Sequence, residues 1–139
     1  MKIKICGIKN LEDAIFSSEM GADYLGFNFY QKSIRFITPN KCKQIVEEIK
    51  LNFPHVICVG VFVNNPKNQV ASILEKTSIR LAQFSGDEPT SLLEFFGDVS
   101  FKAIRPKNME DAQKIINSIP PRSASPEFLI DNYEYGSFG

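Results

Sequence analysis

Segments with strand character alternate with segments of helix character along the whole chain of 139 residues, and this alternation most constrains the fold. The clearest strand is Val56–Val63, a nearly continuous β-branched run typical of a strand buried on both faces. Strict alternation of strand and helix implies right-handed crossovers and a parallel sheet. The sequence therefore predicts an α/β protein.

Apolar spacing and capping residues together predict six strands and five helices. The strands are expected at 2–6, 24–29, 56–63, 79–84, 99–104 and 128–131. The helices are expected at 10–20, at 39 to about 52, from Pro66 onward through Leu74, at 89–96 and at 108–119. A doubly wound sheet could use all of these elements. An eight-stranded barrel would need two more strands and three more helices. Strand spacing alone does not choose between the two folds.

The charge balance and the cysteines limit the class of protein. Lys+Arg and Asp+Glu both number 16, which argues against a general binder of nucleic acid or anionic membranes. No apolar stretch approaches the roughly 20 residues of a membrane helix, and the N-terminus shows no signal peptide. The three cysteines, Cys6, Cys42 and Cys58, have no metal-ligand spacing. We therefore expect reduced thiols, a cytoplasmic protein and no metal.

Two residues at opposite ends of the chain are candidates for acid–base chemistry. Cys6 and Asp131 each end a short apolar run, at 2–6 and 128–131. In a parallel α/β barrel, catalytic groups lie at the carboxyl ends of strands. A thiol and a carboxyl placed there could serve as base and acid. Taken alone, Cys6 would more often be a core residue. Asp131 taken alone could equally be a turn former or a helix cap.

A set of short motifs narrows the choice of fold. In chain order they are Lys4-Ile-Cys-Gly-Ile8, Ser33-Ile-Arg-Phe-Ile37, Val59-Gly-Val-Phe-Val-Asn64, Ala82-Gln-Phe-Ser-Gly-Asp-Glu88, Phe128-Leu-Ile-Asp-Asn-Tyr133 and Gly136-Ser-Phe-Gly139. Each motif is weak alone. In this order and spacing they resemble the phosphoribosylanthranilate isomerase family of tryptophan biosynthesis, and the resemblance runs from residue 2 to residue 139.

The resemblance implies a parallel (β/α)8 barrel of the TIM type and an Amadori rearrangement of an aminoaldose phosphate to an aminoketose phosphate. It implies that Cys6 is the general base and Asp131 the general acid. It assigns Arg35 to the anthranilate carboxylate and Gln83 to the lining of the site. The substrate would be a small phosphosugar, and neither a metal nor an organic cofactor is expected.

The sequence departs from the family pattern at three places. Ser85 stands where the family usually has His, and Ile34 stands where it has Pro. Gly139 aligns with the first glycine of the family's Gly-Gly-Thr-Gly-like motif. Residues 1–139 are therefore expected to form a single partial barrel domain that lacks the last two βα units.

Two other functions stay open at this point. The chain could be a non-catalytic remnant, or a fragment that needs a complementing chain or a dimer partner at its open sheet edges. It could also be a related phosphosugar epimerase, but such enzymes generally use His and Asp metal ligands. The single histidine, His55, lies outside the strand tips and argues against an epimerase.

Overall fold

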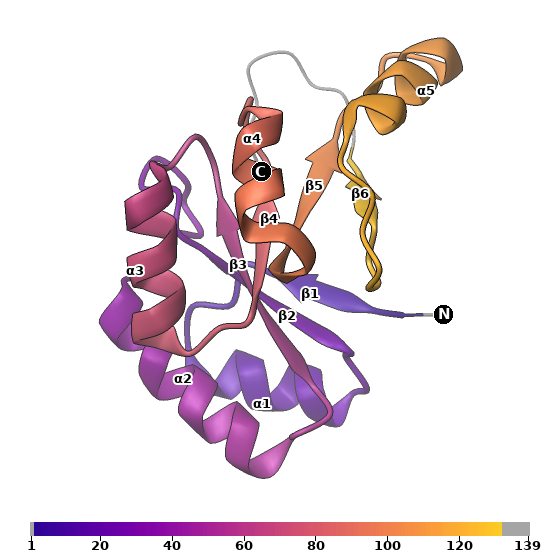
Figure 1. Cartoon of the computed structure of the whole chain (residues 1–139). Coiled ribbons are helices and arrows are strands. Elements are labelled where there is room, and N and C mark those ends of the chain that lie inside the picture. Colours follow the sequence, from indigo (N-terminus) through magenta and orange to yellow (C-terminus); the bar gives the residue numbers. More distant parts are fainter. Residues whose placement is uncertain (1, 132–139) are drawn as a thin grey trace.

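A single parallel sheet with helices along one side organises the chain (Figure 1). The computed structural model describes residues 2–131. In chain order the elements are β1 (Lys4–Cys6), α1 (Leu11–Glu19), β2 (Tyr24–Asn28), α2 (Pro39–Asn52), β3 (Ile57–Phe62), α3 (Lys67–Thr77), β4 (Leu81–Phe84), α4 (Thr90–Phe96), the 3₁₀ turn η1 (Gly97–Val99), β5 (Ser100–Ile104), α5 (Met109–Ser118) and β6 (Phe128–Ile130). The predicted order of six strands and five α-helices is confirmed.

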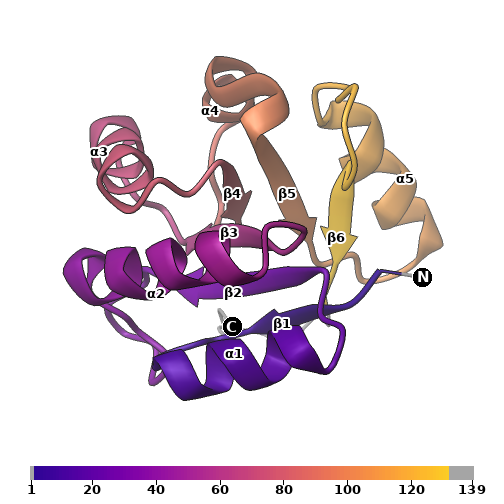
Figure 2. The same cartoon turned by 90° about the horizontal axis from the view of Figure 1, so that it is seen from below.

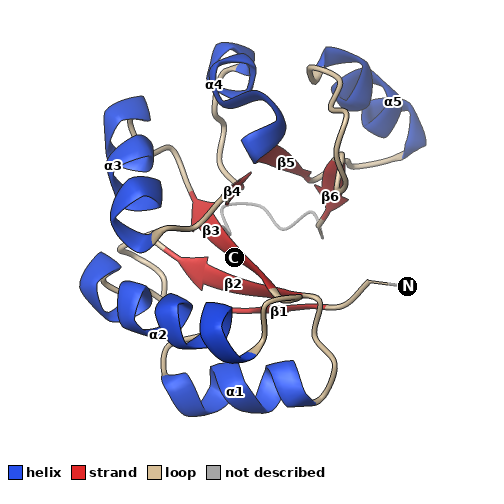
Figure 3. Ribbon diagram, turned by 60° about the horizontal axis from the view of Figure 1, so that its bottom comes forward, coloured by secondary structure: helices blue, strands red, loops and turns tan. Residues whose placement is uncertain are grey.

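The order of strands in the sheet decides between the two predicted folds. The order is β1-β2-β3-β4-β5-β6, and every neighbouring pair is parallel. A doubly wound sheet reverses its strand order at a switch point and carries helices on both faces. Here the order never reverses, and the strands form an arc with all five helices on its outer side (Figure 3). The fold is therefore an incomplete TIM-type barrel, and the doubly wound alternative is wrong.

Side chains alternate between the two faces of this arc. Toward the helices they form the main core, in which Leu25, Phe27, Phe62 and Phe84 are fully buried. On the inner face Val59, Leu81 and Phe101 form a second cluster, and Tyr24 and Leu129 pack against it. The same curvature is visible from below, where the helices surround the sheet from the outside (Figure 2). The inner face is the side on which a barrel interior would lie.

Helix starts follow the local capping chemistry that the sequence indicates. The Asn10 side chain accepts a hydrogen bond from the Asp13 amide at 2.7 Å and begins α1. Thr38 caps α2, and Pro39 occupies its first turn. Asn108 caps α5 through the Asp111 amide at 2.9 Å. Polar groups placed before apolar stripes thus position the helices over the outer face.

All six predicted strands are longer than the observed ones, and at the ends of two of them a nearby polar side chain binds the backbone amide. The Val63 amide donates to the Asn65 side chain at 3.0 Å, which ends β3 at Phe62. The Ile3 amide donates to the Asp23 carboxylate at 2.8 Å, so β1 begins at Lys4 and not at residue 2. The 3₁₀ turn η1 takes Val99, so β5 starts at Ser100.

The two outer strands each have one strand neighbour among residues 2–131. β1 pairs with β2, and β6 pairs with β5. Apolar side chains near these strands are exposed, at 42% for Ile3, 41% for Ile5 and 63% for Ile130. Unpaired strand edges flanked by apolar side chains are surfaces that another strand can cover.

Candidate active site

The carboxyl ends of the parallel strands bring distant residues to one edge of the sheet. Cys6 is the last residue of β1, and Asp131 directly follows β6. The register sets Cys6 beside Gly26 on the inner face. Asp131 comes two residues after Leu129, which packs on the inner cluster, and residues two apart along a strand share a face. Both candidate acid–base residues therefore belong to the same end and the same face of the sheet.

Cys6 occupies space that exists because its neighbour is a glycine. A Cβ built on Gly26 would lie 2.9 Å from the Cys6 Sγ and 3.0 Å from the Lys4 Nζ. Any larger residue would displace the thiol. Cys6 is exposed, whereas Cys42 and Cys58 are buried among the helix-facing side chains. Burial raises the pKa of the Cys42 thiol and raises that of Cys58 to about 11. Cys6 is thus the one accessible thiol of the three.

Asp131 continues the β5–β6 ladder by one residue. Its amide donates to the Ile104 carbonyl at 2.9 Å, and its carboxylate lies 3.5 Å from the Arg105 Nε. Arg105 follows the last residue of β5, which is a strand-tip position. We had not singled out Arg105 from the sequence, although a charged residue directly after an apolar strand was an available signal.

Arg35 lies against Gly7, the residue that follows Cys6, although the two positions are 28 apart in the sequence. A Cβ on Gly7 would meet the Arg35 Cδ at 2.5 Å, so the aliphatic part of the arginine rests directly on this glycine. Gly7 has a φ of +92°, a conformation that glycine adopts without strain. The structure therefore brings Arg35 to the tip of β1, beside the residue that follows Cys6.

The loop that carries Arg35 is fastened to the tip of β2. The Asn28 Nδ2 donates to the Ser33 Oγ at 3.1 Å, and the same hydroxyl accepts the Arg35 amide at 3.1 Å. Ile34 is 90% exposed, and its carbonyl accepts a hydrogen bond from the Lys9 ammonium. Asn28 is buried and was missed from the sequence, because an asparagine inside an aromatic strand gives no local sign of its partner.

Gln83 lies on the inner face of β4 and is buried. Its Nε2 donates to the Ser85 Oγ at 2.9 Å, while its Oε1 finds no hydrogen-bond partner among residues 2–131. Ser85 is also buried. The two side chains form a polar pair at the tip of β4, and the amide oxygen of Gln83 is left to accept a hydrogen bond.

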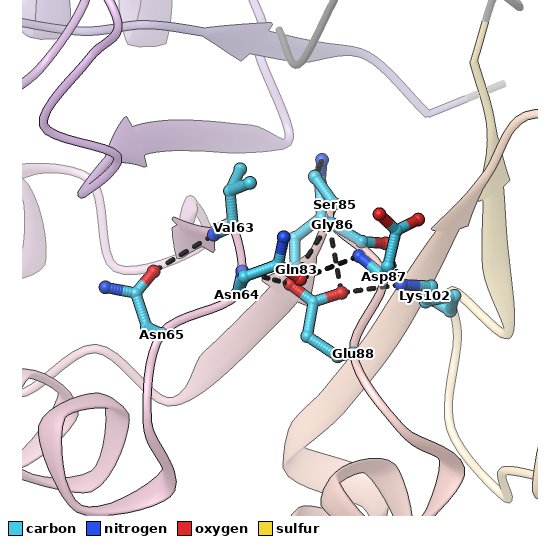
Figure 4. A network of polar contacts seen from close by, with 9 residues as sticks. All are labelled: Val63, Asn64, Asn65, Gln83, Ser85, Gly86, Asp87, Glu88 and Lys102. Carbon is cyan, nitrogen blue, oxygen red and sulfur yellow. Dashed lines mark hydrogen bonds and ion pairs between the residues drawn. The ribbon is translucent and has the colours of Figure 1, made fainter. Parts of the chain in front are cut away.

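A buried ion pair supports this strand tip (Figure 4). The Lys102 ammonium of β5 lies 2.5 Å from the Glu88 carboxylate, and the exposed fractions of the two side chains are 13% and 1%. Glu88 also accepts the backbone amides of Asn64 and Gly86, at 2.9 and 3.0 Å. Neither member of the ion pair was identified from the sequence.

Several expectations concern absent features or residues outside the described part of the chain. Within residues 2–131, no group of three or more His, Cys, Asp or Glu side chains is arranged to hold a metal. No helix in this range has the length and apolar character needed to cross a membrane. Tyr133 and the Gly136–Gly139 motif lie outside the described residues.

Comparison with known proteins gives one consistent result. Residues 3–137 match the family model of N-(5'-phosphoribosyl)anthranilate (PRA) isomerase. The Thermotoga maritima protein named N-(5'-phosphoribosyl)anthranilate isomerase is 38% identical over 119 residues, which are 84% of this chain and 57% of the relative. This chain thus spans less than two thirds of that protein's length.

Solved structures agree with the sequence matches. The crystal structure of phosphoribosyl anthranilate isomerase from Thermotoga maritima superposes with a TM-score of 0.84 at 34% identity, covering 99% of this chain and 64% of that one. A second structure is of the isomerase in complex with reduced 1-(o-carboxyphenylamino)-1-deoxyribulose 5-phosphate. Its TM-score is 0.82 at 35% identity, with 96% of this chain and 66% of the other covered.

Proposed function

Because the chain belongs to the N-(5'-phosphoribosyl)anthranilate isomerase family, we propose that it forms part of an isomerase that converts this aminoaldose phosphate to the aminoketose phosphate in tryptophan biosynthesis. The observation that carries the proposal is the gathering of Cys6, Arg35 and Gln83 at the strand tips of one sheet, with Asp131 at the same end. These are a thiol, a guanidinium, an amide and a carboxyl, and each has a task in this reaction.

The first step opens the ribose ring. Asp131 donates a proton to the ring oxygen, the C1–O bond breaks, and the nitrogen lone pair forms the protonated Schiff base. A carboxyl at the tip of β6 is held for this task by the bond from its own amide to Ile104. The Arg105 guanidinium, 3.5 Å away, can stabilise the carboxylate that remains after proton transfer.

The second step moves a proton away from carbon. The Cys6 thiolate takes the C2 proton, and the electron pair of that C–H bond forms the C1=C2 bond of an enolamine as the positive charge on nitrogen is neutralised. The enolamine then tautomerises, which places a ketone at C2 and a proton on C1. Arg35 would bind the anthranilate carboxylate with its planar guanidinium. No step requires an external oxidant, because C1 is reduced as C2 is oxidised.

We also propose that residues 1–139 supply six strands and five helices of an eight-stranded barrel. The support is the unpaired outer edge of β1 and of β6 among the described residues, together with the exposed isoleucines there. A polypeptide that supplies the other two units would cover these edges. The small, diffusible phosphosugar substrate and the three free cysteines are consistent with a cytoplasmic enzyme.

The experiment is an isomerase assay in D₂O with N-(5'-phosphoribosyl)anthranilate, followed by NMR. The mechanism predicts loss of the C2 proton and entry of one deuterium at C1 of the product. A polypeptide of these 139 residues alone is expected to turn over little or no substrate. Addition of a polypeptide with the last two βα units should produce turnover. Turnover whose product carries the original C2 hydrogen at C1, with no deuterium there, would exclude this mechanism. No turnover in the completed barrel would favour a non-catalytic role.

A further inference from the structure

Glu88 and Lys102 form an ion pair that the isomerase chemistry above does not use. The Lys102 Nζ lies 2.5 Å from the Glu88 Oε2, and both side chains are largely removed from solvent. Taking two charges out of water is costly unless each is also hydrogen-bonded. Further bonds of both groups converge on the backbone of the loop after β4 (Figure 4).

Most of the further hydrogen bonds of Glu88 and Lys102 are made with the backbone of Gly86. Both oxygens of the Glu88 carboxylate accept the Gly86 amide at 3.0 Å, and the Lys102 ammonium donates to the Gly86 carbonyl at 2.5 Å. A Cβ on Gly86 would lie 2.5 Å from the Asn64 Oδ1. The backbone that directly follows Ser85 is therefore held on three sides.

The same carboxylate joins two neighbouring loops. Glu88 accepts the Asn64 amide at 2.9 Å, and the Asn64 side chain accepts the Asp87 amide at 2.8 Å. Asn64 adopts a φ of 54°, a left-handed conformation that asparagine tolerates better than most residues. The loop after β3 and the loop after β4 are thus linked by reciprocal hydrogen bonds that centre on Glu88.

The loop after β4 begins beside Gln83 and Ser85, the polar pair on the inner face. The Ser85 Oγ accepts the bond from the Gln83 Nε2, which leaves the Ser85 hydroxyl proton available for another acceptor. The Gln83 Oε1 is buried and has no partner among residues 2–131. A buried acceptor without a partner is unfavourable, so it points to a ligand that donates. Together the pair offers one donor and one acceptor, which is the complement of a hydroxyl group.

We propose that Glu88 and Lys102 are positioning residues that fix Gln83 and Ser85 as a donor–acceptor pair for one hydroxyl of the phosphosugar. This inference rests on the proposed function. It predicts that the ion pair acts on substrate affinity through the orientation of the β4 tip and does not act on proton transfer, which the proposed mechanism assigns to Cys6 and Asp131.

The test measures binding of reduced 1-(o-carboxyphenylamino)-1-deoxyribulose 5-phosphate to the full-length protein by calorimetry. Lys102→Met and Glu88→Gln should each raise Kd about tenfold, the scale of one to two hydrogen bonds. They should raise KM while leaving kcat nearly unchanged. Lys114→Met is the matched control, because it removes an exposed ion pair with Glu110 and should leave both constants unchanged. Glu88→Gln keeps an oxygen that can accept the Asn64 and Gly86 amides. It therefore provides the binding measurement if Lys102→Met folds poorly.

A series of analogues that each lack one hydroxyl sharpens the test. One of them should bind the wild-type protein more weakly than the parent compound, and this difference should disappear in Lys102→Met. A merely structural role would lower the unfolding midpoint and leave the discrimination between hydroxyls intact. Equal affinities of wild type and Lys102→Met for the parent compound, at a temperature where both are folded, would overturn the proposal.

Hydrogen exchange provides a second readout that needs no ligand. The amides of Asn64, Gly86 and Asp87 should exchange at least about tenfold faster in Lys102→Met, while amides inside β3 remain unchanged. If the wild-type protein does not bind the analogue but the exchange result holds, the proposed function is wrong and the role of Glu88 and Lys102 in holding the loops stands. If exchange at these amides is unchanged, the positioning role is refuted whatever the activity.

Discussion

Replacing Gly7 by alanine tests whether the contact between the tip of β1 and Arg35 matters for binding. Gly7 has a φ of +92°, and a Cβ there would lie 2.5 Å from the Arg35 Cδ and 3.2 Å from its Cγ. The distance to the Cδ is shorter than real Cβ contacts allow, and the distance to the Cγ is tighter than most of them, so the arginine must move. Gly21 offers a matched control, because its φ is also +92° but an added Cβ would meet nothing within 4 Å.

The two substitutions share one energetic cost and differ in another. An alanine held at positive φ costs about 1–3 kcal/mol of folding free energy, and both variants incur it. Only Gly7→Ala also displaces Arg35 from its place at the tip of β1. A charge-assisted hydrogen bond to a carboxylate is worth about 1.5–3 kcal/mol, so its loss should weaken binding by about 10- to 150-fold. Gly21→Ala should lose stability without losing affinity.

Calorimetry with the reduced product analogue measures the affinities, and urea unfolding measures the stabilities. We expect Gly7→Ala to bind as weakly as Arg35→Ala, and Gly21→Ala to bind as tightly as the wild type. Combining Gly7→Ala with Arg35→Ala should add little further loss of affinity, because the first change acts through the second residue. Equal affinities of Gly7→Ala and Gly21→Ala would show that the arginine does not bind the substrate from this position.

Further predictions concern catalysis, cysteine reactivity and stability. In the complete barrel, Cys6→Ala and Asp131→Asn should each lower kcat by about 10²–10⁴-fold in steady-state assays, with little change in affinity. A Cys6→Ala enzyme with near-normal kcat would require another base. Iodoacetamide near neutral pH should modify Cys6 before Cys42 or Cys58, as read by mass spectrometry, since burial raises the pKa of the other two thiols. Cys58 in the folded protein should react appreciably only as the pH approaches its pKa of about 11, and early labelling of Cys58 would contradict its burial. Lys102→Met should lower the free energy of urea unfolding by about 3–5 kcal/mol, because it leaves the buried Glu88 carboxylate without its counter-charge. A loss below about 1 kcal/mol would contradict the ion pair between Lys102 and Glu88.

Local chemistry made much of the fold predictable. Asn10, Pro39 and Asn108 begin their helices through interactions within three or four residues, so the sequence carries the whole signal. The strand at 56–63 was predicted one residue too long at each end. The Val63 amide donates to the Asn65 side chain, and the Val56 amide donates to the Phe53 carbonyl. Hydrophobicity alone does not reveal that these groups compete with strand pairing.

The candidate site was only partly predictable, because several of its contacts join residues far apart in the chain. Arg35 was assigned through its motif, but its contact with Gly7 depends on where the loop after β2 folds back. Lys102 lies in an apolar strand and Glu88 in a polar loop, so each has the sequence pattern of a solvated charge. Their burial arises from the pairing of β4 with β5, which periodicity cannot supply.

The strand order also bears on how the chain folds during its synthesis. Each strand pairs with the one made just before it, as in Lys4 with Tyr24, Val59 with Leu81 and Ala82 with Ser100. Among residues 2–131, every strand pairing joins strands that are consecutive in the sequence. The loop-closure entropy of each pairing is therefore that of one connecting helix and its turns. The sheet can grow by one strand and its connecting helix at a time as the polypeptide leaves the ribosome.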